Sequence, residues 1–237
     1  MQVKLFEAAI FDLDGVIVDT AKFHYQAWKR LAEELGFAFS EIENEQLKGV
    51  SRMDSLELLL RAGGITNLTR GQKEILASRK NEWYKEYLTT LTPADVLPGV
   101  ARFLHHLRSS GIKTAIASAS KNAPLILDKV NIGPLFDVVV DGNSIVKAKP
   151  DPEVFLQAAR LLDAAPSACY VFEDAEAGVE GAIRAGMRVV GIGAEQLLAR
   201  AHLTVTSFEQ LEPVFLLSRI GVSDPGVTVM GDSPYEH

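Results

Sequence analysis

Short apolar runs alternate with segments of helical periodicity along most of this chain. Apolar runs typical of buried strands lie at residues 7–11, 113–117, 136–140, 169–172, 188–193 and 203–205. Helical patterns lie between several of them, at residues 100–109, after Ser120, at residues 153–162 and up to Ala185. Strands that are apolar on both faces need helices on both sides of their sheet. The alternation therefore predicts an α/β fold with a doubly wound, parallel, Rossmann-like sheet.

A long helical stretch separates the first predicted strand from the second. Apolar residues recur at helical spacing from Tyr25 to Leu35, and no convincing strand pattern follows before residue 92. We interpret this stretch as a small helical domain inserted after the first strand, with a hinge at residues 15–20 and 92–95. The predicted organisation is an α/β core of residues 1–16 and 93–222, a helical cap domain of residues 17–92 and a loosely held tail of residues 223–237.

The charge balance and the apolar pattern argue against several classes of protein. A net charge of −7 with scattered lysines and arginines argues against a nucleic-acid surface. No apolar run approaches the roughly 20 residues that cross a bilayer, and no N-terminal stretch has the pattern of a signal peptide. We therefore expect a cytoplasmic, monomeric protein without a nucleic-acid or membrane partner. The single cysteine, Cys169, lies in an apolar run and is expected to be a buried, inert thiol.

Two carboxylates directly follow the first predicted strand. Asp12 and Asp14 stand one residue apart, and Gly15 breaks the chain after them. Ligands of open α/β sheets bind at the carboxyl ends of the strands, where two like charges repel unless a divalent cation binds or one carboxyl is protonated. Glu173 and Asp174 end another predicted strand in the same way. The alternative at this stage is a solvated acidic turn.

Groups suited to an anion follow two further strands. Ser118 begins the segment Ser118–Asn122, in which backbone amides and a helix N-terminus favour an anion. A simple helix cap by Ser120 is the alternative. Lys149 is held at a defined place by the prolines that follow it, and it could neutralise both a phosphate and a carboxylate. An ordinary surface lysine is the alternative there.

The helical insert carries a loop that combines cations, a glycine and hydroxyls. Within residues 47–55, Gly49 lets backbone amides approach an anion, and the planar guanidinium of Arg52 suits a phosphate. A generic basic loop is the alternative. The stretch Arg79–Asn81 could add another cation to the same face, and His24 could assist closure near the hinge.

The order of these groups resembles the four motifs of the haloacid dehalogenase-like superfamily of phosphotransferases. The string Asp-Leu-Asp-Gly-Val follows the N-terminal strand, and Ser118, Lys149 and the pair Glu173–Asp174 come later in the same order as the motifs. The resemblance implies that Asp12 is the phosphoryl-accepting nucleophile and Asp14 a general acid/base. It further implies that Ser118 and Lys149 hold the phosphate. The ligands that it implies for a Mg²⁺ cofactor are Asp12, Asp14, Glu173 and Asp174.

Several strings are similar to those of mutases within that superfamily that act on sugar phosphates. They are Asn44–Arg52, Pro93–Val96, Ser118–Asn122 and the order of His24 and Trp28. The resemblance implies an isomerase that interconverts β-glucose 1-phosphate and glucose 6-phosphate through a phosphoaspartate and glucose 1,6-bisphosphate.

The same resemblance implies roles for further residues. Arg52 would grip the distal phosphate, His24 would hold Asp14 in its working position, and Thr20 would join the catalytic group. Contacts with sugar or phosphate are implied for Trp28, Lys48, Gly49, Val50, Ser51, Arg52, Ser55, Lys80, Ala119, Ser120, Lys121 and Asn122.

A second anion site in the insert favours a mutase over a hydrolase, because a mutase must keep its phosphoaspartate away from water. Two alternatives stay open. The first is a phosphatase on the same fold that acts on another small phosphate ester. The second is a non-enzymatic phosphoaspartate switch like a receiver domain.

Overall fold

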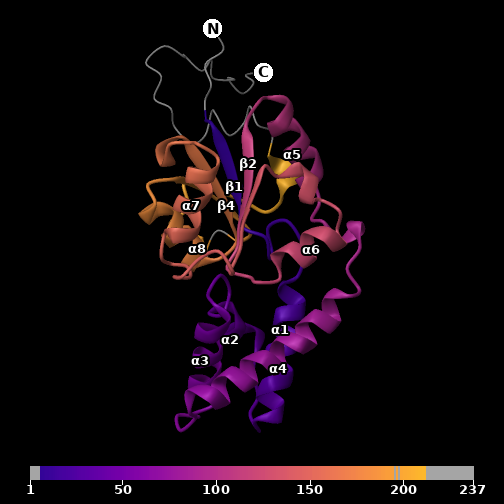
Figure 1. Ribbon diagram of the computed structural model, residues 1–237, viewed down its shortest axis with the longest axis vertical. Coiled ribbons are helices and arrows are strands. Elements are labelled where there is room, and N and C mark those ends of the chain that lie inside the picture. Colours follow the sequence, from indigo (N-terminus) through magenta and orange to yellow (C-terminus); the bar gives the residue numbers. More distant parts are fainter. Residues whose placement is uncertain (1–5, 195, 197, 212–237) are drawn as a thin grey trace, which may run out of the picture.

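The predicted strands form one parallel sheet in the computed structural model, which describes residues 6–211 except residues 195 and 197 (Figure 1). The strands are β1 (Ala8–Phe11), β2 (Lys113–Ala117), β3 (Val138–Val140), β4 (Cys169–Glu173), β5 (Arg188–Ile192) and β6 (Leu203–Val205). Their order across the sheet is β3-β2-β1-β4-β5-β6. The doubly wound fold is confirmed, and the order reverses between β1 and β4, where ligands of such sheets bind.

Helices cover both faces of this sheet, which explains why its central strands are apolar on both sides. On one face, α5 (Val100–Ser109) and α6 (Ala123–Lys129) pack in one cluster with Phe11 and Ile116. On the other face, α7 (Glu153–Leu161) and α8 (Glu176–Arg184) pack in a second cluster with Ile10.

An aromatic cluster packs the two central strands against one helical layer. Phe11 of β1 stacks on Phe172 of β4, with ring centroids 4.5 Å apart and planes inclined by 10°. Phe103 of α5 and Phe208 lie 5.4 and 5.7 Å from the ring of Phe172. Phe11 and Phe172 each stand one residue before a carboxylate. Their packing therefore determines where those carboxylates leave the sheet.

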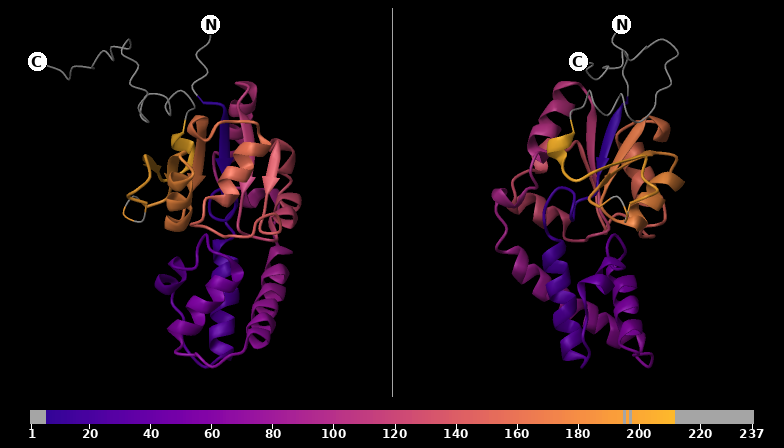
Figure 2. Two further views of the ribbon diagram at one scale, coloured as in Figure 1. Left: turned by 60° about the vertical axis from the view of Figure 1, so that its left-hand side comes forward. Right: turned by 180° about the vertical axis from the view of Figure 1, so that it is seen from behind.

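Four further helices lie beyond the carboxyl ends of the strands. They are α1 (Ala21–Glu34), α2 (Glu41–Glu45), α3 (Arg52–Ala62) and α4 (Arg70–Leu88), and they stand together as a separate group of helices (Figure 1 and Figure 2). The two segments that join this group to the sheet are paired, because the N–H of Leu97 donates to the carbonyl of Ile17 at 2.9 Å and Val18 bridges Val96. We call residues 17–92 the cap and propose that they form a separate domain.

Four strand boundaries differ from those predicted: β1 begins one residue later, β4 ends one residue later, and β3 and β5 are shorter. Residues Gly133–Leu135 form a short 3-10 helix, so Phe136 and Asp137 stay outside β3. Gly193 lies beyond the end of β5 and has a φ of +137°, a backbone conformation that residues other than glycine rarely adopt. Other short 3-10 helices lie at Pro93–Asp95, Pro166–Ala168 and Phe208–Gln210.

The remaining sequence predictions concern the cysteine, the tail and membrane spans. Cys169 is buried at the start of β4, where burial raises the pKa of its thiol to about 11. The predicted tail, residues 223–237, and the end of the predicted core, residues 212–222, lie outside the described residues. Among the helices that the structure describes, none has the length and apolar character needed to cross a membrane.

We expect Phe11→Ala to lower the free energy of unfolding by about 3–5 kcal/mol, because it removes a fully buried ring from the aromatic cluster. Urea denaturation followed by circular dichroism measures this change. Leu161→Ala is the control, since Leu161 is 50% exposed and should lose less than about 1 kcal/mol. Equal losses in the two variants would contradict the role assigned to the cluster.

Candidate active site

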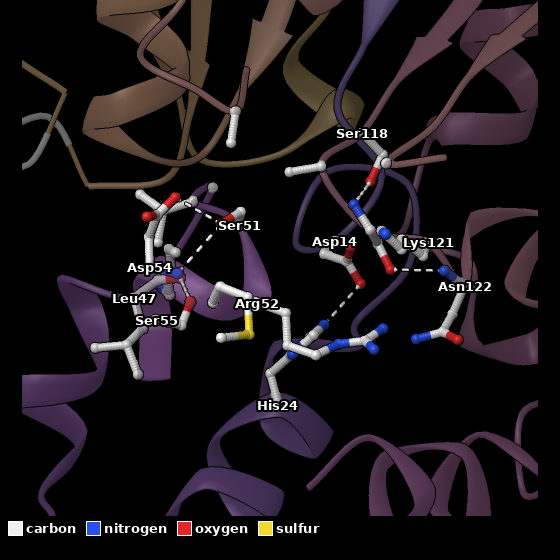
Figure 3. A pocket seen from close by; sticks show the side chains of 18 of the residues that line it. Asp14, His24, Leu47, Ser51, Arg52, Asp54, Ser55, Ser118, Lys121 and Asn122 are labelled. Atoms are coloured by element: carbon white, nitrogen blue, oxygen red, sulfur yellow. Dashed lines mark hydrogen bonds and ion pairs between the residues drawn. The ribbon is translucent and has the colours of Figure 1, made fainter. Parts of the chain in front are cut away.

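A cavity of about 450 Å³ lies between the carboxyl ends of the strands and the cap (Figure 3). Most residues singled out in the sequence line it: Asp12, Asp14, His24, Trp28, Lys48, Gly49, Val50, Ser51, Arg52, Ser55, Lys80, Ser118, Ala119, Ser120, Lys121, Asn122 and Asp174. Thr20, Lys149 and Glu173 lie behind this lining, in a chain of contacts with Asp14 and Asp12. The fold thus brings the residues of all four motifs together.

Lys149 lies between two buried carboxylates beneath the cavity. Its Nζ donates to Asp12 Oδ1 and, at 2.5 Å, to Glu173 Oε1. The other oxygen of Glu173 accepts the backbone N–H groups of Asp174 and Ala175 at 3.0 and 3.1 Å. Burial would lower the pKa of Lys149, but the charges of Asp12 and Glu173 outweigh burial and raise that pKa. The alternative of a surface lysine is wrong, because only 2% of Lys149 is exposed.

The sequence interpretation placed Lys149 at the end of a strand, and this placement is wrong. Strand β3 ends at Val140, and the loop that follows it carries the lysine back to the sheet edge. Glu153, the first residue of α7, accepts the backbone N–H groups of Val146 and Lys147 at 2.8 and 2.9 Å and so anchors this loop. The peptide bond between Lys149 and Pro150 is cis.

Asp12 and Asp174 share an environment that disfavours negative charge. Burial raises the pKa of Asp12 to about 7; Lys149 counteracts this rise, while Glu173 and Asp14 add to it. Burial and the charges of Glu173 and Asp12 raise the pKa of Asp174 well above its ordinary value. Among the described residues, none donates a hydrogen bond to the side chain of Asp174. The alternative of a solvated acidic turn is therefore wrong for Asp12, which is 5% exposed.

Asp14 faces the cap instead of Lys149. Its Oδ1 accepts from Thr20 Oγ1 at 2.5 Å and from the Tyr84 hydroxyl at 3.1 Å, and it lies 3.7 Å from His24 Nε2. Burial would raise the pKa of Asp14, but nearby His24 and the hydroxyls of Thr20 and Tyr84 outweigh burial and lower it. Two carboxylates one residue apart are thus held in opposite electrostatic environments.

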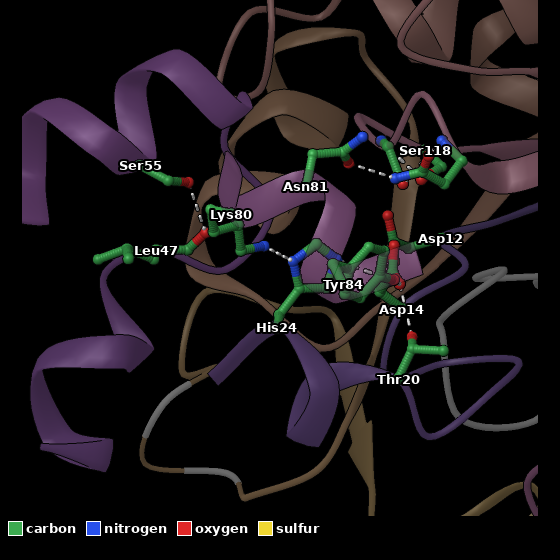
Figure 4. A network of polar contacts seen from close by, with 12 residues as sticks. Asp12, Asp14, Thr20, His24, Leu47, Ser55, Lys80, Asn81, Tyr84 and Ser118 are labelled. Atoms are coloured by element: carbon green, nitrogen blue, oxygen red, sulfur yellow. Dashed lines mark hydrogen bonds and ion pairs between the residues drawn. The ribbon is translucent and has the colours of Figure 1, made fainter. Parts of the chain in front are cut away.

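A buried polar cluster in the cap stands next to Asp14 (Figure 4). Lys80 Nζ lies 2.9 Å from His24 Nδ1, and it lies over the rings of Trp28 and Tyr84 at 4.5 and 4.8 Å. Burial and the charge of Arg52 lower the pKa of Lys80 well below its ordinary value, against the opposing effect of Asp14. Burial and the charge of Lys80 lower the pKa of His24, against the opposing effect of Asp14.

The loop after β2 turns its polar groups toward the cavity. The hydroxyl oxygen of Ser118 accepts the N–H of Ser120 at 3.0 Å, and Ser120 Oγ accepts the N–H of Asn122 at 3.2 Å. Ser120 does not cap α6 as its N-cap residue, since Asn122 holds that position. Asn122 Nδ2 donates to Asn81 Oδ1 of the cap at 3.0 Å, so the two sides of the cavity are joined there.

The cap contributes cations at the far side of the cavity. Arg52 begins α3, and none of the described residues forms a hydrogen bond or ion pair with its guanidinium, whose pKa burial lowers. Lys48 pairs with Glu45 at 2.9 Å. Ser51 is the N-cap of α3 and accepts from the N–H of Asp54 at 3.2 Å. Arg79 does not join them, because it pairs with Glu34 on the exposed surface.

The cap loop rests directly on the loop that carries Asp174. Gly49 has a φ of +73°, and a Cβ built there would lie 3.3 Å from the Cβ of Ala175. Gly15 packs more closely, since a Cβ on it would lie 2.2 Å from Oδ2 of Asp174. Both glycines permit close approach of backbone to the acidic end of β4.

Sequence reasoning missed Tyr84 and assigned no contact to Asn81, although Asn81 belongs to the predicted stretch Arg79–Asn81. Both are buried on α4, and they contact Asp14 and Asn122. Tyr84 stands one helical turn after Lys80, and this spacing is the signal that would have grouped it with the predicted face.

The sequence pattern of the haloacid dehalogenase-like hydrolases matches residues 6–186. This chain belongs to the haloacid dehalogenase-like hydrolase family. Within the family, the chain is 46% identical over 206 residues to β-phosphoglucomutase of Bacillus subtilis (strain 168), an alignment that covers 86% of this chain and 91% of that protein. A phosphorylated carbohydrates phosphatase of Thermotoga maritima is 32% identical over 189 residues, with 78% and 85% covered.

A solved structure of the same family supports the fold in detail. The crystal structure of β-phosphoglucomutase from Clostridium difficile matches with a TM-score of 0.87 and 39% identity, and the match covers 91% of this chain and 97% of that one. The predicted resemblance to the family is therefore confirmed.

We expect Gly15→Ala to destabilise the protein by about 1–3 kcal/mol more than Gly36→Ala. The two glycines have φ angles of +88° and +87°, but a Cβ on Gly36 meets nothing within 4 Å, whereas one on Gly15 meets Asp174. The difference between their unfolding free energies thus isolates the contact with that carboxylate. Chemical denaturation measures it, and equal losses would show that Asp174 moves aside without cost.

Proposed function

We propose that this protein is a phosphoryl-transfer isomerase that interconverts β-glucose 1-phosphate and glucose 6-phosphate through a phosphoaspartate and glucose 1,6-bisphosphate. The observation that carries the proposal is that groups suited to phosphate reach one cavity from both the core and the cap. Asp12, Ser118 and Lys149 stand on the core side, and Arg52 stands unpaired among the described residues on the cap side. The 46% identity to a β-phosphoglucomutase supports it.

We further propose that Mg²⁺ binds beside Asp12. The carboxylates of Asp12 and Asp174 and the backbone carbonyl of Asp14 would hold it, and hard oxygen donors suit this ion. Burial and mutual repulsion raise the pKa of both carboxylates, so a cation there would offset negative charge that Lys149 leaves uncompensated. Glu173, whose two oxygens are occupied, would support Lys149 instead.

The donor set also fits the way this ion usually binds. Within the described part of the chain, no group of three or more His, Cys, Asp and Glu side chains is arranged to hold a metal ion alone. Mg²⁺ commonly takes one or two carboxylates and completes its shell with water and substrate phosphate. Bound there, it would neutralise the charge that otherwise keeps a carboxylate and a phosphate apart.

The chain's own residues would divide the transfer between them. An oxygen of Asp12 would form a bond to phosphorus while the bond from phosphorus to the sugar oxygen breaks. Lys149 and Ser118 would hold the phosphoryl oxygens, and Asp14 would give a proton to the departing sugar oxygen. That proton would come from the preceding half of the cycle, in which Asp14 takes it from the attacking sugar hydroxyl as the phosphoryl group leaves Asp12.

Retention of the intermediate would depend on the cap. A phosphoaspartate survives only where water is excluded, and Gly49 closes the cap loop onto the loop after β4. Arg52 would hold the phosphate that is not transferred, so the bisphosphate could turn over within the cavity. A cytoplasmic location and a monomeric state stay predictions of the sequence.

We expect the protein with Mg²⁺ and a trace of glucose 1,6-bisphosphate to convert β-glucose 1-phosphate to glucose 6-phosphate. Phosphorus NMR follows both the product and free phosphate in one sample. Removing the metal with EDTA should stop the conversion, and added Mg²⁺ should restore it. Release of inorganic phosphate faster than glucose 6-phosphate would overturn the proposal and favour a phosphatase.

We expect Arg52→Ala to lower kcat/KM for β-glucose 1-phosphate by roughly 100-fold, because it removes charged hydrogen bonds to the distal phosphate. Arg79→Ala is the matched control, since Arg79 belongs to the same cap but pairs with Glu34 outside the cavity. Steady-state kinetics measures both variants. An unchanged kcat/KM in Arg52→Ala would mean that the cap only covers the site.

A further inference from the structure

The contacts of Asp14 fall on one of its two oxygens. Oδ1 accepts the hydroxyls of Thr20 and Tyr84 at 2.5 and 3.1 Å and lies 3.7 Å from His24 Nε2. Thr20 lies in the entry to the cap, His24 on α1 and Tyr84 on α4. Three groups from the cap side therefore converge on a single oxygen of a residue that follows β1.

The second oxygen of Asp14 is open. Among the described residues, no side chain or N–H donates to Oδ2. Every fully buried side-chain nitrogen or oxygen in the described part of the chain has a partner, so an unpartnered Oδ2 must be accessible. Asp14 lines the cavity, and 20% of its side chain is exposed. Oδ2 thus faces the space in which a substrate would lie.

The packing of Tyr84 restrains the orientation of the Asp14 carboxylate. The residue is fully buried, and its ring lies against the ring of His24, with centroids 3.9 Å apart and planes tilted by 32°. Lys80 Nζ lies 4.8 Å from the centre of the Tyr84 ring. The Tyr84 hydroxyl donates to Asp14 Oδ1 at 3.1 Å from this packed position. A rigid donor from a packed helix limits rotation of the Asp14 carboxylate.

We propose that Tyr84 is a positioning residue that, together with Thr20, restrains Oδ1 of Asp14 and leaves Oδ2 as the oxygen that exchanges the proton with the sugar. The inference rests on the proposed role of Asp14 in phosphoryl transfer. As the bond from phosphorus to the sugar oxygen breaks and the bond to Asp12 forms, Oδ2 gives its proton to the departing oxygen. That proton comes from the preceding transfer, in which Oδ2 takes it from the sugar hydroxyl that attacks phosphorus as the bond to Asp12 breaks.

This role predicts a dependence on the leaving group. A sugar alkoxide is a poor leaving group and needs the proton, whereas 4-nitrophenolate departs without one. Loss of the Tyr84 hydroxyl should therefore slow transfer from a sugar phosphate and spare transfer from 4-nitrophenyl phosphate. A merely structural role would lower both rates together.

The test compares Tyr84→Phe with the wild-type protein on both substrates in the presence of Mg²⁺. Isomerisation of β-glucose 1-phosphate should show a kcat about tenfold lower. Its KM, and the first-turnover release of 4-nitrophenolate measured by rapid mixing, should change by less than about twofold. Tyr87→Phe is the matched control, since Tyr87 lies on the same helix and contacts Phe23.

Equal losses on the two substrates, or no loss on either, would overturn the proposal. Should Tyr84→Phe fail to fold, as judged by its thermal transition, Thr20→Val removes the other hydroxyl. It should lower the rate on the sugar phosphate more than the rate on 4-nitrophenyl phosphate. If the wild-type protein hydrolyses β-glucose 1-phosphate instead of isomerising it, the proposed isomerase function is wrong, but the proposed role of Tyr84 is not affected. The comparison of alkyl and aryl phosphates then tests Tyr84 on the hydrolysis rates.

Discussion

The contact of Lys149 with Asp12 and Glu173 is the interaction on which the site depends. A lysine without solvent is tolerated only where carboxylates compensate its charge, and removing one partner of such a buried set is strongly destabilising. The sheet order makes the set possible, because β1 lies beside β4 and their last residues lead into Asp12 and include Glu173. The same lysine would hold a phosphoryl oxygen in the proposed reaction, so one side chain serves both packing and chemistry.

Much of the core could be predicted from the sequence, because its signals are local. Apolar runs of a few residues identify strands, and a parallel sheet gathers their carboxyl ends at one edge whatever the details of packing. The positions of Asp12, Ser118 and Asp174 follow from that rule. The position of Lys149 follows from the rule only in part. The lysine comes after the end of β3, and a loop anchored by Glu153 brings it back to the same edge of the sheet.

The inward face of α4 could not be predicted in the same way. Periodicity identifies a buried face when its residues are apolar, yet α4 buries Lys80 and Asn81 among its aromatic residues. Neighbouring positions also differ sharply, because Arg79 pairs on the surface while Lys80 lies inside. Only the packing of α4 against α1 decides which polar residue enters the cavity, and this packing is not a local property. The spacing of Tyr84 from Lys80 indicates a shared face, but only the packing shows that this face contacts Asp14.

The two aspartates of the first motif show how the fold separates functions within three residues. Asp12 is surrounded by groups of the core, and Lys149 and burial together set its pKa. Asp14 takes its polar contacts from the cap side, where Thr20, His24 and Tyr84 surround one oxygen. The charge of the proposed nucleophile is therefore set within the sheet layer, and the orientation of the proposed proton carrier is set from the cap. A substitution in the cap helices should act on proton transfer to the sugar before it acts on attack at phosphorus.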